Sequence, residues 1–188
     1  LNQIFQFLNT KVSEKPSDNY HFEYDQIVSL GEVISTKIVH AFLNQNNAKC
    51  EWLDARKVVA TNDKWREAKI NWDSTEVKIK AAVEDRFKSG ASTIISQGFI
   101  GHTPEGFTAA IFAYVLEAND VTIWKDVPGM LNADPKWFDN TILIEQISFR
   151  EAIELAYFGA SVIHPRTIQP LKRKNIPLHI KSFVKPEE

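Results

Sequence analysis

Hydrophobic residues recur along the chain at two different spacings, and these spacings predict alternating helices and strands. Ile27, Leu30 and Ile34 follow the spacing of one helical face and predict a long helix over residues 24–46. Short β-branched or alternating apolar runs predict strands instead. The predicted strands are 50–53, 93–100, 121–124, 141–147 and 176–180.

Capping residues predict where the remaining helices begin and end. Asp73 with Glu76, and Ser148 with Glu151, have the spacing of a capping box, so we expect helices over 73–89 and 148–159. Gly90 suits the position just after a helix. We expect a helix over 108–118 after the strand at 93–100 and its loop, and Pro165 suits the first turn of another helix.

Strands that alternate with helices predict an α/β fold with a mostly parallel central sheet covered on both faces, that is, a three-layer sandwich. The chain has 188 residues and shows no internal repeat, low-complexity tract or linker. We therefore predict one domain over residues 1–188.

Composition narrows the function classes. The chain is 44% hydrophobic and 24% charged with a net charge of −2, which disfavours disorder, nucleic-acid binding and attraction to anionic membranes. The single cysteine, Cys50, precludes an internal disulfide, and we expect it to be a structural strand residue in a cytoplasmic protein. No apolar run has the length of a membrane span, and no signal peptide is visible. The chain opens without Met inside an amphipathic segment, so we expect its natural N-terminus to lie upstream.

Several common catalytic motifs are absent from the sequence. It contains neither a Walker-type phosphate loop nor a Gly-x-Gly-x-x-Gly turn nor a Gly-x-Ser-x-Gly elbow. None of its five histidines is paired at the spacing of a zinc site. The commonest nucleotide, hydrolase and zinc interpretations are therefore disfavoured.

The segment that follows the strand at 121–124 concentrates polar groups at a strand end. Lys125 and Asp126 come first, then Pro128-Gly129, which predicts a type II turn, and then Asp134-Pro135. In open α/β sheets, ligands bind at the carboxyl ends of strands. An ordinary strand-to-loop transition remains the alternative.

Three further segments could contact a ligand. Glu32 follows Gly31 inside the long helix and could receive an ammonium group, or it could simply face water. The glycines in 97–101, around Phe99, would let a substrate approach the main chain, but a plain turn would need them too. In 164–167 a helix begins with Arg166 near its N-terminus, which suits an anion or a structural ion pair.

Five segments together resemble the aspartate kinases, within the amino acid kinase fold. They are Ser-Leu-Gly-Glu (29–32), Gln-Gly-Phe-Ile-Gly (97–101), Trp-Lys-Asp-Val-Pro-Gly (124–129), Ala-Asp-Pro (133–135) and Glu-Leu-Ala-Tyr-Phe-Gly-Ala-Ser-Val-Ile-His-Pro-Arg-Thr (154–167). The resemblance extends from about residue 24 to the C-terminus. Segment 154–167 is its most specific part.

The resemblance implies transfer of the γ-phosphoryl group of ATP to the side-chain carboxylate of L-aspartate. It implies that Glu32 and Phe99 bind aspartate, and that the nucleotide is bound by Lys125, Asp126, Lys136 and Ser161. Magnesium is expected to arrive on the phosphates of ATP, without a protein cage. A homo-oligomer is also implied.

The chain departs from the family pattern in two respects. A Lys-Phe-Gly-Gly-Thr-Ser strand and a Gly-Arg-Gly-Gly-Ser-Asp loop, with the expected catalytic Lys and Asp, are missing. We expect them to lie before residue 1 and between 107 and 108 of the intact protein, and regulatory ACT domains to lie outside this chain. Several members of the family have Lys at the position of Ser161. Lys125 could supply the positive charge that Ser161 lacks.

Two alternatives stay open. A true deletion of both motifs would leave a catalytically silent nucleotide-binding or regulatory module. Another enzyme of the same fold, such as a glutamate, acetylglutamate or uridylate kinase, is the second alternative.

Overall fold

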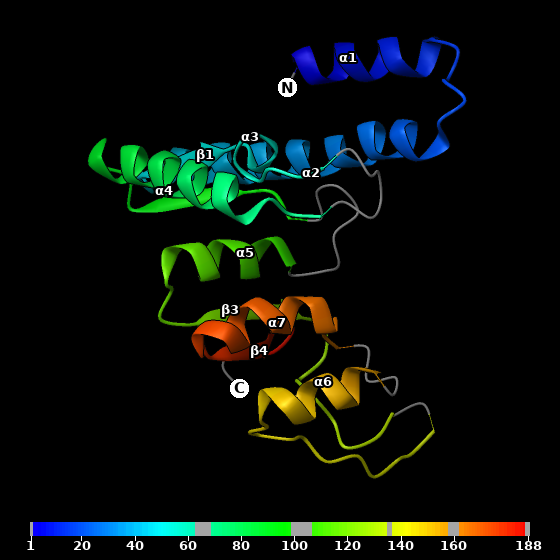
Figure 1. Ribbon diagram of the computed structural model, residues 1–188, viewed down its shortest axis with the longest axis vertical. Helices are drawn as coiled ribbons and strands as arrows, with labels where there is room; N and C mark the ends of the chain where they lie inside the picture. Colours follow the sequence, from blue (N-terminus) through cyan, green and yellow to red (C-terminus); the bar gives the residue numbers. More distant parts are fainter. Residues whose placement is uncertain (1, 63–68, 99–106, 135–136, 158–161, 187–188) are drawn as a thin grey trace. The chain divides into compact units, whose positions relative to one another are not determined.

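A computed structural model describes residues 2–62, 69–98, 107–134, 137–157 and 162–186 (Figure 1). The chain divides into two compact units, Leu1–Thr103 and Pro104–Glu188, and each is described by itself. Among the described residues, no helix combines the length and the apolar character needed to cross a membrane.

The first unit is mainly helical and holds one pair of strands. Its elements are α1 (Asn2–Ser13), α2 (Tyr20–Gln45), β1 (Cys50–Leu53), α3 (Ala55–Val58), α4 (Trp72–Lys88) and β2 (Thr93–Ser96). Strands β1 and β2 are parallel, in a register that runs from Cys50 opposite Thr93 to Leu53 opposite Ser96. The core of the unit gathers residues from α2, β1, α3 and α4. Its buried members include Leu30, Val33, Leu53, Val58, Ile79 and Val83.

The N-cap of helix α4 lies two residues earlier than predicted, at Asn71 and not at Asp73. The Asn71 side chain accepts a hydrogen bond from the Ser74 amide at 3.1 Å. Glu76, the expected partner in the capping box, instead forms an ion pair with Lys80 one turn later. Gly90 follows the helix at φ 96°, as predicted.

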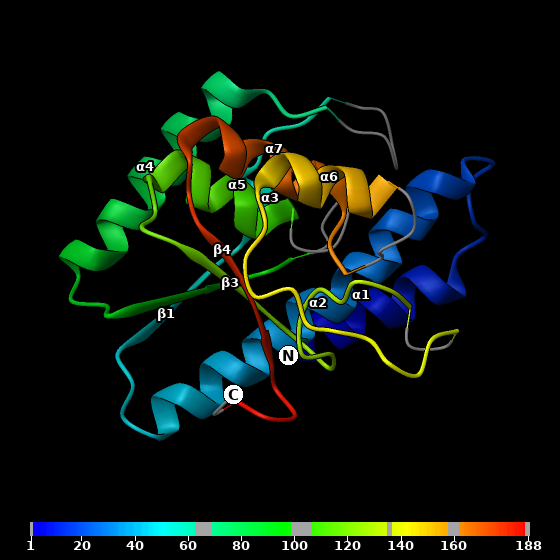
Figure 2. The same ribbon diagram turned by 90° about the horizontal axis from the view of Figure 1, so that it is seen from below.

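The described residues of the second unit form three helices and two parallel strands. Its elements are α5 (Phe107–Leu116), β3 (Val121–Lys125), α6 (Phe149–Tyr157), α7 (Pro165–Lys174) and β4 (Leu178–Ser182). Figure 2 shows β3 and β4 side by side, with Val121 opposite Leu178 and Lys125 opposite Ser182. Two buried clusters share Ile123, Phe149 and Leu178 as packing partners. The parallel pairing predicted from the sequence is thus confirmed in both units.

Helices α6 and α7 begin as predicted. Ser148 and Glu151 form the reciprocal capping box, in which the Ser148 amide donates to the Glu151 carboxylate at 3.0 Å and the Glu151 amide donates to the Ser148 hydroxyl at 3.2 Å. Pro165 occupies the first turn of α7. These two starts are set locally by side-chain-to-backbone hydrogen bonds.

Two strand predictions in this unit need correction. Residues 141–147 form no strand; they make a single antiparallel bridge between Leu131 and Leu143, because the Asn132 side chain takes the Ile142 amide at 2.7 Å in place of a longer ladder. The last strand begins at Leu178 and not at Ile176. Asn175, at φ 51°, ends α7 in the left-handed conformation, and the Ile176 amide bonds back to Leu171, so neither residue can join the sheet.

Candidate active site

Glu32 lies near the middle of α2, and its carboxylate has no partner within the part of the chain that the structure describes. The side chain is half-buried. Its backbone carbonyl accepts hydrogen bonds from the hydroxyls of Ser35 at 3.1 Å and Thr36 at 2.8 Å. A half-buried carboxylate without a protein partner is chemically suited to receive a cation from a ligand.

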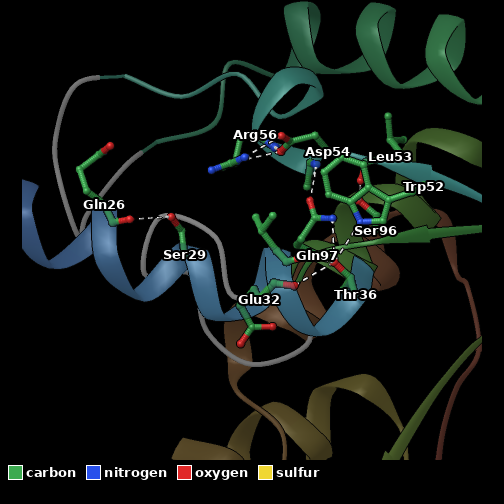
Figure 3. A network of polar contacts seen from close by, with 12 residues as sticks. Gln26, Ser29, Glu32, Thr36, Trp52, Leu53, Asp54, Arg56, Ser96 and Gln97 are labelled. Carbon is green, nitrogen blue, oxygen red and sulfur yellow. Dashed lines mark hydrogen bonds and ion pairs between the residues drawn. The ribbon is translucent and has the colours of Figure 1, made fainter. Parts of the chain in front are cut away.

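A buried amide, on the residue that follows β2, joins the α2 turn after Glu32 to the start of α3 (Figure 3). Gln97, only 1% exposed, accepts a hydrogen bond from the Ala55 amide at 2.8 Å and donates to the Thr36 hydroxyl at 3.1 Å. Trp52 of β1 donates its indole N–H to the same hydroxyl at 3.1 Å. The Glu32 carboxylate points away from this network (Figure 3).

Asp54 lies beside this network, at the turn from β1 into α3, and its carboxylate is bonded to Arg56. Its carboxylate caps α3 through the Arg56 amide at 3.1 Å and accepts the Arg56 guanidinium at 2.9 and 2.7 Å. These hydrogen bonds from Arg56 lower the pKa of the Asp54 carboxyl below its ordinary value, against the opposing effect of burial. Asp54 therefore stays ionised at neutral pH.

The end of β3 brings Lys125 and Asp126 to one edge of the second unit. The Lys125 ammonium donates to the Val162 carbonyl at 3.1 Å, which ties the strand end to the residues before α7. The Lys125 carbonyl accepts from the Phe183 amide at 2.9 Å and continues the pairing with β4. Asp126 comes immediately after the strand and is exposed. The prediction that polar groups collect at this strand end is confirmed.

A cavity of about 310 Å³ opens beside Asp126. Its lining combines the Asp126 carboxylate, two ammonium groups and apolar side chains. The lining residues include Asp126, Pro128, Ile180, Lys181, Ser182 and Lys185. A lining that combines apolar side chains with a few charged groups is typical of a site for a small polar molecule such as a nucleotide.

Gly129 shapes the chain beside this cavity. It adopts φ 152°, and a Cβ atom added there would lie 2.9 Å from the Leu143 side chain. Segment 126–130 bends, but it does not form the type II turn predicted from Pro128-Gly129. The φ of Gly129 lies well above the value of about 80° that a type II turn requires. A residue with a side chain would be disfavoured both by backbone conformation and by space.

The remaining predicted residues divide into two groups. His164 is the N-cap of α7 and accepts the Arg166 amide at its Nδ1 at 3.1 Å, so its ring has a structural role there, while the Arg166 side chain is exposed. Phe99, Lys136 and Ser161 lie outside the described residues.

Sequence reasoning missed Lys181 and Lys185. Helical spacing identifies Thr36 as a neighbour of Glu32, but it does not reveal the hydrogen bonds of Thr36 to Trp52 and Gln97. Lys181 and Lys185 reach the cavity only because β4 pairs with β3, and strand pairing is not visible in a single sequence.

Comparison with known proteins agrees with this geometry. The model of the amino acid kinase family matches residues 4–182. Lysine-sensitive aspartokinase 3 of Escherichia coli is 36% identical over 173 residues, which are 86% of this chain and 38% of that protein. The chloroplastic bifunctional aspartokinase/homoserine dehydrogenase of Daucus carota is 34% identical over 171 residues, 85% of this chain and 18% of that protein.

A solved structure extends the likeness to three dimensions. The crystal structure of E. coli aspartokinase III in complex with aspartate and ADP matches with a TM-score of 0.89 at 31% identity, over 98% of this chain and 43% of that one. The chain therefore has the α/β fold of these kinases, and it spans less than half the length of each of these relatives.

Proposed function

Because this chain belongs to the amino acid kinase family, we propose that the protein that contains it is an aspartate kinase. The proposed reaction forms 4-phospho-L-aspartate and ADP from L-aspartate and ATP, the first step of lysine, threonine and methionine biosynthesis. The observation that carries the proposal is the match over 98% of the chain to an aspartokinase that was crystallised with aspartate and ADP.

The chemistry places modest demands on side chains. An oxygen of the aspartate carboxylate attacks the γ-phosphorus, and the bond to the β–γ bridging oxygen breaks to release ADP. A carboxylate is already ionised at neutral pH, so the nucleophile needs no strong general base. The protein must mainly position the two substrates and neutralise charge on the phosphates.

The proposed roles follow the geometry of each unit. Glu32 would bind the α-ammonium group of aspartate, since its half-buried carboxylate lacks a partner among the described residues. Asp126 and Lys125 would contact the nucleotide at the end of β3, beside the 310 Å³ cavity. We also assign Phe99 to the aspartate site, and Lys136 and Ser161 to the nucleotide site, on the family resemblance. The catalytic Lys and Asp are expected in the segments outside this chain.

Magnesium is proposed to enter bound to ATP. No cluster of three or more His, Cys, Asp or Glu side chains forms a potential cage within the described residues. Mg²⁺ commonly uses one or two carboxylates together with substrate phosphates and water, and Asp126, which lines the cavity, would be available as such a carboxylate. The metal would neutralise phosphate charge during transfer.

The full-length protein tests the proposal directly. It should phosphorylate aspartate in the presence of ATP and magnesium, and be much less active with glutamate, acetylglutamate or UMP as acceptor. Turnover with one of those acceptors and not with aspartate would identify a different kinase of this fold. ATP binding without turnover on any acceptor would identify a catalytically silent module.

A further inference from the structure

The amide of Gln97 is held in one orientation by its surroundings. The side chain is 1% exposed, so both of its polar atoms need partners within the protein. Its oxygen accepts the Ala55 N–H at 2.8 Å, and a flipped amide would place two N–H groups against each other. The amide nitrogen must therefore face the Thr36 hydroxyl, at 3.1 Å.

The Thr36 hydroxyl uses its whole hydrogen-bonding capacity. A hydroxyl has one hydrogen to donate and two lone pairs to accept with. Here the lone pairs accept from Gln97 and from the Trp52 indole, each at 3.1 Å. The hydrogen is directed to the Glu32 carbonyl at 2.8 Å, with the Val33 carbonyl at 3.2 Å as the weaker choice.

This hydroxyl links the turn of α2 that carries Glu32 to β1 and to the residue after β2. Ser35 also donates to the Glu32 carbonyl, at 3.1 Å, but it is exposed and its hydroxyl has no further partner among the described residues. The two hydroxyls therefore bond the same carbonyl, but only Thr36 connects it to the strands. A hydroxyl bonded to a preceding carbonyl also adjusts the local bend of a helix.

We propose that Thr36 and Gln97 are positioning residues that hold the Glu32 turn of α2 and thereby set the affinity for aspartate. The inference rests on the proposed function, since it assumes that Glu32 binds the aspartate ammonium group. The Glu32 carboxylate has no side-chain partner within the described residues, so its direction depends on how its helical turn is anchored. Displacements of about 1 Å in a binding group are enough to lose substantial affinity.

Steady-state kinetics of the full-length protein, with aspartate and ATP varied separately, tests this inference. Thr36→Val keeps the shape of the side chain and removes the hydroxyl, and should raise the KM for aspartate about tenfold with the KM for ATP unchanged. Thr36→Ser restores the hydroxyl and should restore the KM for aspartate. Ser35→Ala is the matched control, because it removes a bond to the same carbonyl without breaking the link to the strands.

A second variant covers the case in which Thr36→Val does not fold. Gln97→Glu keeps the size of the side chain and the acceptor for Ala55, but it has no N–H for Thr36, and it should raise the KM for aspartate in the same way. A purely structural role would lower thermal stability in these variants and leave both KM values unchanged, and that result would overturn the inference. So would an equal rise of the KM for aspartate in Ser35→Ala.

The wild-type protein separates this inference from the proposed function. Absence of aspartate turnover in the wild type would contradict the proposed function, and this inference with it. Wild-type turnover together with an unchanged KM for aspartate in both Thr36→Val and Gln97→Glu would overturn the inference alone.

Discussion

At the scale of single residues, Glu32 differs from Glu23 and Glu151 in the hydrogen bonding of its carboxylate. Glu23, on the same helix, accepts the Ser17 amide at 3.0 Å, and Glu151 caps α6. The Glu32 carboxylate has no such bond within the described residues. A ligand with a cationic group can therefore supply the missing partner.

Replacement of Glu32 should separate aspartate binding from nucleotide binding. Glu32→Ala is expected to raise the KM for aspartate by about tenfold to a hundredfold, the range for loss of one charge-assisted hydrogen bond, with little change in the KM for ATP. Glu32→Gln should have a smaller effect of the same kind. Glu23→Gln on the same helix is the control and should leave both constants unchanged. An unchanged KM for aspartate in Glu32→Ala would refute the role of Glu32.

At the scale of elements, α2 contains a glycine that its local structure does not require. Gly31 lies inside the helix, and a Cβ atom added there would meet no atom within 4 Å. Glycine costs roughly 1 kcal/mol relative to alanine inside a helix. Within the described residues, close packing of another backbone therefore does not explain this glycine, and we predict that it leaves room for a ligand next to Glu32.

We expect Gly31→Ala to stabilise the folded protein and to weaken its binding of aspartate. The free energy of unfolding should rise by about 0.5–1 kcal/mol in urea denaturation, while the KM for aspartate increases. Gly90→Ala is the control, since φ 96° disfavours a side chain there, and it should lower the free energy of unfolding without changing either KM. A stabilised Gly31→Ala enzyme with unchanged kinetics would show that this glycine serves no ligand.

The turn between β1 and α3 should depend on pH in a defined direction. Hydrogen bonds from Arg56 lower the pKa of Asp54 in the folded protein below the ordinary value of 3.8. Its stabilising contribution is therefore complete above that value and is lost as the pH falls through the lowered pKa. Asp54→Asn keeps an N-cap but lacks the charge, so the stability difference between wild type and variant should shrink below about pH 4.

Urea denaturation of wild type and Asp54→Asn between pH 2.5 and 7, roughly the range over which carboxylates titrate, measures this difference. Glu84→Gln provides the control, because Glu84 also has a lowered pKa but pairs with Lys88 on an exposed helix surface. Salt should weaken the Glu84 effect strongly and the Asp54 effect much less. A pH-independent difference for Asp54→Asn would refute the ion pair as a source of stability.

At the scale of the whole molecule, most of the order of elements could be predicted from the sequence, but helices α1 and α3 and several boundaries could not. Helical spacing and capping boxes located α2, α6 and the start of α7, because those signals are local. Asn71 and Asp73 are both good N-caps two residues apart, and residue type alone does not decide between them. The strand expected over 141–147 failed because an alternating pattern does not reveal whether a neighbouring strand is present.

The candidate site was predicted in part for the same reason. Glu32 and the end of β3 carry local signals, such as a glycine inside a helix and polar residues after an apolar strand. The buried bonds of Gln97 reach residues distant in the sequence, Thr36 and Ala55, and no periodicity indicates them. Phe99, Lys136 and Ser161 stay predictions.

The two units carry the two proposed binding roles, Glu32 in one and Asp126 in the other. Because each residue would contact a different substrate, their replacements should act independently. Asp126→Ala is expected to raise the KM for ATP about tenfold and to leave the KM for aspartate unchanged. In the double variant with Glu32→Ala, the two effects should add within about 0.5 kcal/mol of transition-state free energy. A larger coupling would mean that the two residues share a substrate or a partner.

The saturated hydroxyl of Thr36 also has an evolutionary consequence. The hydroxyl donates its hydrogen to Glu32 and accepts from Trp52 and Gln97 with its two lone pairs. A lineage that loses this hydroxyl leaves two N–H donors, those of Trp52 and Gln97, without an acceptor. Tolerated changes at these positions should therefore occur together: a hydrophobic residue at 36 accompanied by an apolar ring at 52 and a residue without an N–H donor at 97. Related sequences should inherit these three positions as a single unit, although they are separated by up to 61 positions along the chain.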